Sequence, residues 1–294
     1  MSHGMLSASI ALGRKLNLFD ALAKTATEAA PVDASIVADF AGCKERYEGF
    51  LARTLPDTFV VRPLPYNPTP EGWRPGEAGD TSWGDRTREF LGFNNLSVAE
   101  SSFLPCMMKS FDKLTDAFQK NSGRYGLDYS EFADFYATMD VVTQAMHGKH
   151  LISDYFPLEF QVLNARELLP EWTASFDFVT IFDACHDQQR PDLCIREIYR
   201  ALKPGGLFAM LEVAGTSNAY EDMQQSELNA ARYAISMFHC LPVAYNSPDA
   251  LGLGTKWGER RARKLLTDCG FNEVNIEVIK PAFFPINYVY LCRK

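Results

Sequence analysis

The segment FDFVTIFDACHDQQRPDLCIREIYRALKPGGLFAMLEV, residues 176–213, constrains the fold more than any other part of the chain. It begins with a nearly continuous apolar run at 176–184 and ends with another at 207–213, as expected of parallel strands covered on both faces. Between them, Pro191 opens a stretch with apolar residues at helical spacing, and Pro-Gly-Gly at 204–206 ends it. The order strand, helix, strand predicts a unit of an α/β sheet.

The flanking sequence continues the alternation of strands and helices. Gly270 ends the last expected helix, and the short link between the last two expected strands favours an antiparallel pair at the end of the sheet. Together with the first segment, this order predicts a parallel or mixed α/β sheet. The further expected elements are a strand at 160–164, helices at about 220–240 and 257–269, and strands at 274–279 and 288–292.

The N-terminal half has the pattern of helices instead. Apolar residues recur at helical spacing over 5–27, and a short helix follows that Asp33 or Ser35 caps and Gly42 ends. Helical patterning returns at 86–150 with many aromatic residues, which favours a packed helical core over a cofactor site.

One stretch between these helical parts has no periodicity. Residues 55–85 are rich in Pro and Gly, which is typical of a long loop. The change of pattern near residue 150 predicts two domains. We expect a mostly helical domain at 1–150 and an α/β domain at 151–294.

Composition narrows the class of protein. The 294 residues are 47% hydrophobic and 22% charged, with a net charge of −8, so a nucleic acid is an unlikely partner. No apolar run reaches the ~18–20 residues that a membrane helix needs, and the N-terminus lacks the pattern of a secretory signal. The seven cysteines are scattered without CxxC pairs, which favours reduced thiols and a cytoplasmic location over disulfides or a zinc site.

Several segments resemble class I S-adenosylmethionine (SAM) dependent methyltransferases. FDFVTIFDACHD, ALKPGGLFAMLEV, GFNEVNIEV and NYVYLCRK are similar to the second half of that core. LNLFDAL, AGCKERY, HGKHLISDYFP, MFHCLPV and GTKWGERRARKLL are similar to a subgroup with an N-terminal winged-helix-like domain. The resemblance implies a Rossmann-like sheet, SAM as cofactor, a small-molecule acceptor, and a homodimer formed through the helical domain.

The first half of the family's cofactor site has no counterpart in this chain. In the family, a strand, a glycine-rich loop, a helix and a second strand ending in an acid precede the third strand, and they hold the cofactor. Here the Phe156-Pro157 linker runs almost directly into 158–164, which matches the third strand. The GxGxxxG stretch at 252–258 follows no apolar strand, so we interpret it as a loop that caps the next helix.

A sheet without its first two strands has consequences for stability. We expect the third and fourth strands to pair directly or to leave an apolar edge exposed, which would make the protein poorly stable or oligomeric. The expected fold is therefore an incomplete Rossmann-like methyltransferase sheet, preceded by the helical domain.

The resemblance also indicates a cofactor site. It implies that Asn164, Ala165 and Arg166 contact the adenine, although an ordinary turn after a strand fits these residues equally well. Ligands of open α/β sheets bind beyond the carboxyl ends of the strands, so Asp183 and Ala184 are expected to bind the cofactor as well.

Two histidines are candidates for catalysis. His186 follows the same strand and has the ordinary pKa, near ~6.5, of a general base. His239 is the second candidate base, and a structural role within a helix is its competing interpretation. Cys185, His186 and Asp187 point to opposite faces of an extended chain, so we expect no metal site there.

The sequence leaves alternatives for the acceptor pocket and for the overall function. Tyr233, Met237 and Trp257 either line an apolar acceptor pocket or pack in the core. Three functions compete: a small-molecule methyltransferase, a catalytically inactive methyltransferase-like scaffold or interaction protein, and a DNA-binding regulator. The acidic charge counts against the third.

Overall fold

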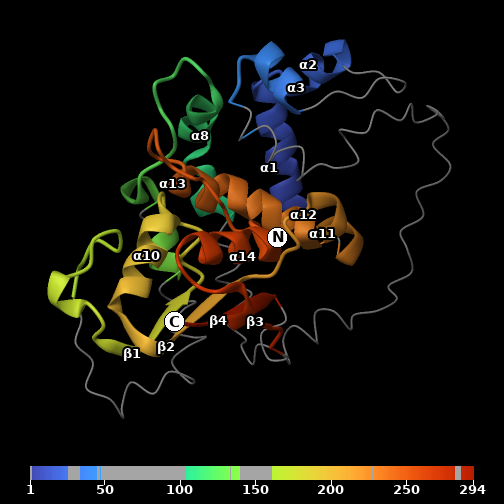
Figure 1. The fold of residues 1–294 in the computed structure, drawn as a ribbon. Coiled ribbons are helices and arrows are strands. Elements are labelled where there is room, and N and C mark those ends of the chain that lie inside the picture. Colours follow the sequence, from blue (N-terminus) through green and yellow to red (C-terminus); the bar gives the residue numbers. More distant parts are fainter. Residues whose placement is uncertain are drawn as a thin grey trace.

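A four-stranded sheet lies at the centre of the C-terminal half of the molecule (Figure 1). The computed structural model describes residues 2–25, 34–44, 47, 104–132, 134–139, 161–226, 228–281 and 286–294. The strand order is β1-β2-β4-β3. The strands are β1 (Phe176–Phe182), β2 (Leu202–Val213), β3 (Ile276–Ile279) and β4 (Asn287–Arg293).

The predicted parallel unit is confirmed. Strand β1 pairs in parallel with β2, and helix α10 (Pro191–Ala201) connects them. Strand β4 runs antiparallel to both β2 and β3, which confirms the expected antiparallel pair at the end of the sheet. The α/β class predicted from the sequence is therefore correct.

The Pro-Gly-Gly segment interrupts the register of β2 and does not precede it. Phe176 faces Leu202, but Phe178 faces Leu207, so the residues between form an irregularity in the ladder. Gly205 takes a left-handed conformation there, with φ of 80°. Strand β2 thus begins at Leu202, earlier than the predicted start at residue 207.

The outer edge of β1 lacks a neighbour among the described residues. The strand expected at 160–164 is wrong for its described part, because 161–164 is irregular and Val162 is fully exposed. Within the described ranges β1 pairs only with β2, and Phe178 and Phe182 are each 56% exposed. An apolar edge left unpaired by the described residues is consistent with one of the two outcomes expected for a sheet that lacks its first strands.

Helices cover the sheet and extend toward the N-terminal part. The helical region expected at about 220–240 is present as several pieces, and Asn218 caps the first by accepting hydrogen bonds from the backbone N–H groups of Tyr220 and Glu221. The pieces are α11 (Ala219–Gln225), α12 (Leu228–Ile235), a π-helical turn at Ser236–Cys240 and α13 (Leu241–Ala244). The next helix is α14 (Gly258–Asp268), close to its predicted range.

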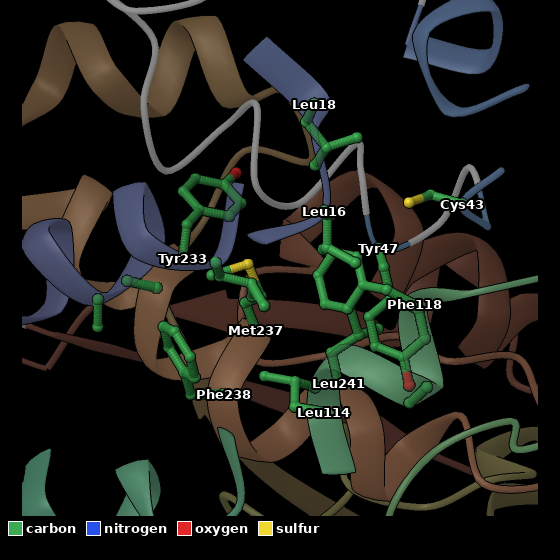
Figure 2. Close-up of a cluster of buried hydrophobic side chains, with 14 of the residues drawn as sticks. Leu16, Leu18, Cys43, Tyr47, Leu114, Phe118, Tyr233, Met237, Phe238 and Leu241 are labelled. Carbon is green, nitrogen blue, oxygen red and sulfur yellow. The ribbon is translucent and has the colours of Figure 1, made fainter. Parts of the chain in front are cut away.

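The N-terminal helices share one core with these C-terminal helices (Figure 2). Helix α1 packs along α12. Leu16 and Leu18, together with Leu114 and Phe118 of α8, lie in the same buried cluster as residues of α12 and its π-helical continuation. The N-terminal helices are α1 (Ser2–Lys15), α2 (Leu18–Thr25), α3 (Ala34–Ala41) and α8 (Phe111–Phe118). The C-terminal contribution to the cluster includes Tyr233, Met237, Phe238 and Leu241.

Other sequence expectations fall outside the described residues. The loop expected at 55–85 and the domain boundary near residue 150 both lie in undescribed ranges, so the two-domain division stays a prediction. The helix expected over 5–27 is present as α1 and α2 within its described part. No helix in the described ranges combines the length and apolar character needed to cross a membrane.

A buried ion pair joins α11 to the loop before α14. The ammonium group of Lys256 lies 3.7 Å from Oδ2 of Asp222 and 3.2 Å from Oδ1 of Asn229. Asp222 also accepts hydrogen bonds from Tyr233 Oη at 2.7 Å and from Thr216 N at 2.9 Å. Burial lowers the pKa of Lys256 to about 8, and the neighbouring Asp222 offsets only part of this shift.

The lowered pKa of Lys256 should make the protein more stable as the pH rises above 8. Between pH 8 and 10.5 the unfolded chain binds more protons than the folded chain, so the free energy of unfolding rises with pH in this window. We expect the free energy of unfolding of the wild-type protein, relative to that of Lys256→Met, to increase by on the order of 2 kcal/mol between pH 8 and 10. Urea unfolding of both proteins at each pH measures the difference, and parallel pH profiles would contradict this assignment.

Candidate functional site

Polar side chains gather where β1 and β2 end. Glu212 is the second-last residue of β2 and is fully buried. Its carboxylate accepts hydrogen bonds from donor groups that belong to three different residues. The donors are Cys185 N at 3.0 Å, His186 N at 3.3 Å, His186 Nδ1 at 2.5 Å and Trp257 Nε1 at 3.2 Å. The carboxylate therefore ties the loop after β1 to the start of α14.

His186 lies between two carboxylates. Its Nδ1 faces Glu212, and its Nε2 lies 3.3 Å from Oδ1 of Asp187. Burial opposes the charged ring, but Glu212 and Asp187 outweigh it and hold the pKa of His186 well above its ordinary value. This raised pKa favours the charged ring and counts against His186 as a general base, a role that stays a prediction.

Asp183 occupies the end of β1 in a strained conformation. Its φ of 43° lies in the left-handed region, which Asp tolerates better than most residues. The carboxylate accepts a hydrogen bond from Asn287 Nδ2 at 2.7 Å. Burial, reinforced by Glu212, raises the pKa of Asp183 to about 7. Backbone strain of this type is concentrated at functional sites. Ala184 follows directly, and its carbonyl accepts a hydrogen bond from Gln188.

The residues proposed to contact adenine form a local turn. The Asn164 side chain accepts a hydrogen bond from Arg166 N at 3.1 Å, so its amide oxygen is used within its own loop. Ala165 packs at the edge of the core under the sheet. The Arg166 guanidinium donates to Gln189 Oε1 at 2.6 Å, which links this loop to the one after β1. The geometry fits the turn interpretation, and the loop still lies at the carboxyl end of β1.

His239 borders this cluster, since its Nδ1 lies 3.5 Å from Sγ of Cys240, but most of its surroundings are aromatic. Its ring stacks on Phe135 at 4.0 Å between ring centroids, and Tyr136 Oη lies 2.9 Å from its Nε2. Burial, together with the nearby His186, lowers the pKa of His239 to about 3, so the ring is neutral and shares a hydrogen bond with the Tyr136 hydroxyl. These contacts are those of a structural histidine.

The suggested acceptor pocket is part of the core. Tyr233 and Met237 are buried among the N-terminal helices, and Trp257 is buried under the sheet. A pocket of about 120 Å³ lies beside the loop after β1 instead. Its lining residues are Leu127, Asp128, Tyr129, Arg166, Asp187, Gln188, Gln189, Val243 and Asn246.

The residues present fit SAM only in part. The carboxyl edge of β1 offers Asp183, but Asp183 does not line the neighbouring pocket of about 120 Å³, which by itself is smaller than the ~300 Å³ or more typical of sites for ligands of that size. The glycines at 252–258 do not form a cofactor loop, because a Cβ at Gly252 would meet the Tyr245 ring and one at Gly258 would meet Ser217 N. This agrees with the interpretation of that loop as a cap for α14.

The sequence did not single out two of the residues in this cluster. Glu212 carries a charge at the end of an otherwise apolar strand, which is a signal that sequence reasoning can use. Cys240 offers no such signal, because the fold alone brings it beside His186 and Asp187. Cys185, by contrast, is buried with Cys194 and Cys269 in the core under the sheet.

Comparison with known proteins supports the methyltransferase resemblance. A family model described as a methyltransferase domain matches residues 115–210, a span that includes β1, α10 and most of β2. The predicted resemblance is confirmed for this span. The match begins within α8 and crosses residue 150, and a search of curated proteins found no match.

Solved methyltransferase structures are similar to the chain along nearly its whole length. The CurJ carbon methyltransferase is 12% identical with a TM-score of 0.49, over 99% of this chain and 91% of that chain. An O-methyltransferase family 2 protein from Planctomyces limnophilus, in complex with apigenin, is 13% identical with a TM-score of 0.49, over 100% and 92%. The SAM-dependent methyltransferase SibL, in its apo form, is 13% identical with a TM-score of 0.47, over 99% and 96%.

Proposed function

We propose that this chain, with its match to the methyltransferase domain at residues 115–210, is a SAM-dependent methyltransferase-like protein. Its acceptor is a small molecule, and its own turnover is weak. The single observation that carries the proposal is the cluster of Asp183, His186 and Glu212 at the carboxyl ends of two parallel strands, because this edge is where open α/β sheets bind ligands.

The charges at this edge support binding of a cationic cofactor. SAM supplies a methyl group that is already activated on a positively charged sulfonium, so the protein mainly has to bind and orient it. Asp183 is the acid placed to hold the cofactor, and its left-handed backbone directs the end of β1 toward the loop that contains His186. Asn287, on β4, holds the Asp183 carboxylate in place through a hydrogen bond from its Nδ2.

Two features limit turnover. Both candidate bases are occupied, because His186 is held by two carboxylates and His239 by an aromatic cluster with Tyr136. The pocket of about 120 Å³ leaves little room for cofactor and acceptor together. A hydroxyl acceptor needs a general base, so its methylation depends on rearrangement of the loop after β1.

Replacement of Asp183 tests the cofactor site. We expect Asp183→Asn to weaken SAM binding at least about tenfold, because a hydrogen bond to a charged group contributes ~1.5–3 kcal/mol. Asn also tolerates the left-handed backbone, so the fold should be preserved. Asp177→Asn is the matched control, since Asp177 lies at the opposite end of β1 and pairs with Lys203 at the surface. Equal binding by both variants would contradict the placement of the cofactor.

A catalytically inactive interaction protein is the second candidate function. The exposed edge of β1, with Phe178 and Phe182 half exposed, favours it because such an edge invites pairing with another chain. A homodimer through the N-terminal helices is a further proposal from the family resemblance. SAM binding with transfer of a labelled methyl group supports the first function, whereas a folded oligomer without SAM binding supports the second.

A further inference from the structure

A histidine, an aspartate and a cysteine from two separate segments converge beside the candidate site. His186 and Asp187 belong to the loop after β1, and Cys240 ends the π-helical turn after α12. The ligand atoms that they offer all lie within 4.8 Å of one another. This set differs from the adjacent Cys185, His186 and Asp187, since the thiol comes from a different part of the fold.

From this geometry we propose that His186 Nε2, Asp187 Oδ1 and Cys240 Sγ form a binding site for Zn²⁺. An imidazole, a carboxylate and a thiolate are the three types of side chain that bind zinc in proteins. The proposal does not depend on SAM binding.

The separation of two of these atoms already fits a tetrahedral ion. Nε2 of His186 and Oδ1 of Asp187 are 3.3 Å apart. Two ligand atoms at the usual zinc distances, ~2.0–2.2 Å, are ~3.3–3.5 Å apart at a tetrahedral angle. An ion between them therefore requires little movement of either side chain.

A second carboxylate orients the histidine as in known metal sites. Nδ1 of His186 donates to Glu212 Oε2 at 2.5 Å, which directs Nε2 toward Asp187 and Cys240. Metal-binding histidines usually donate their other ring N–H to a carboxylate or carbonyl in this way. Glu212 is held in turn by Trp257 and by two backbone N–H groups, so the ring orientation is fixed before an ion binds.

A buried oxygen without a hydrogen bond points to the position of the ion. Oδ1 of Asp187 is buried and accepts no hydrogen bond from the described part of the chain, although Nε2 of His186 lies nearby. An ion pair between His186 and Asp187 is the competing interpretation, but it leaves this oxygen poorly satisfied. A bound cation would complete its coordination.

The site has an open side. Asp187 also lines the pocket of about 120 Å³, so the ion would lie next to a cavity that can hold water or a small ligand. Three protein ligands with a fourth position open to solvent are typical of catalytic zinc sites, whereas structural sites have four protein ligands. Binding must release the Nε2 proton of His186 and the thiol proton of Cys240 to solvent, because zinc binds the neutral imidazole and the thiolate.

Cobalt substitution tests the proposal directly on the full chain. The protein is stripped with a chelator, titrated with Co²⁺, and then competed with Zn²⁺. We expect one ion per chain and a near-ultraviolet thiolate-to-cobalt charge-transfer band that Zn²⁺ removes. Cys240→Ser should abolish the band, and both Cys240→Ser and Asp187→Asn should weaken Zn²⁺ binding at least about tenfold.

Cys106→Ser is the matched control, since Cys106 is the one cysteine among the seven that is not fully buried, and it lies in another part of the fold. It should leave the band and the affinity unchanged. A cobalt spectrum of the wild-type protein without a thiolate band would overturn the proposal, and so would full Zn²⁺ affinity in Cys240→Ser. The wild-type spectrum decides the question if circular dichroism shows that a variant is misfolded.

Discussion

Glu212→Ala should lower the free energy of unfolding by about 3–5 kcal/mol, because it leaves the charged ring of His186 buried without the carboxylate that accepts its Nδ1 hydrogen bond. The substitution also removes the acceptor of Trp257 Nε1 and of the backbone N–H groups of Cys185 and His186. Each buried donor left without a partner adds its own desolvation cost. Natural domains are stable by only ~5–15 kcal/mol, so a large part of the stability should be lost.

Urea unfolding measures this effect, and Glu277→Ala is the control. Glu277 is a strand glutamate on β3 whose side chain is exposed. Its replacement should change the stability by no more than about 0.5 kcal/mol. Similar small losses in the two variants would show that the polar cluster does not hold the loop after β1 in place.

Gly258→Ala should cost about 3–5 kcal/mol, since it combines an unfavourable backbone conformation with a collision. Gly258 has φ of 79°, where side chains other than Gly are strained. Its added Cβ would lie 2.1 Å from the backbone N of Ser217, which a rotamer change cannot relieve. Ser217 itself has φ of 70° and its Oγ accepts from Arg261 N, so this loop has little freedom to move.

Gly205→Ala separates the two causes. Gly205 has nearly the same φ, 80°, but an added Cβ would meet nothing within 4 Å. Its replacement should cost only about 1–2 kcal/mol, the price of the left-handed conformation alone. Thermal and urea unfolding of both variants give the comparison, and equal losses would refute the close packing of Gly258 on Ser217.

The sheet was largely predictable because its signals are local. The apolar run at 176–184, the Pro191 helix start and the Gly270 helix end gave β1, α10 and the end of α14 nearly in place. The strand at 160–164 failed because apolar composition cannot show whether a partner strand is available, and Val162 lies exposed. The predicted start of β2 at residue 207 is too late, because Pro-Gly-Gly is typical of a turn between a helix and a strand. In the structure this segment is part of the strand, as an irregularity in its pairing with β1.

The sequence predicts only those residues of the candidate site that follow directly from the ends of the strands. The rule that ligands bind beyond the carboxyl ends of strands places Asp183 and His186 at the candidate site, and their roles there stay predictions. The contacts of His186 with Glu212, and of Asp187 with Cys240, join segments far apart in sequence and follow from packing alone. For the same reason the sequence suggested His239 as a base, although its aromatic surroundings make it structural.

Calorimetric titration of the folded chain with SAM and with its demethylated product tests the central claim most directly. Because Asp183 is present and the sequence shows no recognisable glycine-rich cofactor loop, we predict weak but saturable binding with a dissociation constant on the order of 10–100 μM. Binding in this range by the wild-type protein, and binding at least about tenfold weaker in Asp183→Asn, would support a cofactor site at the carboxyl edge of β1. No heat of binding at millimolar ligand, from protein that melts cooperatively, would contradict the claim.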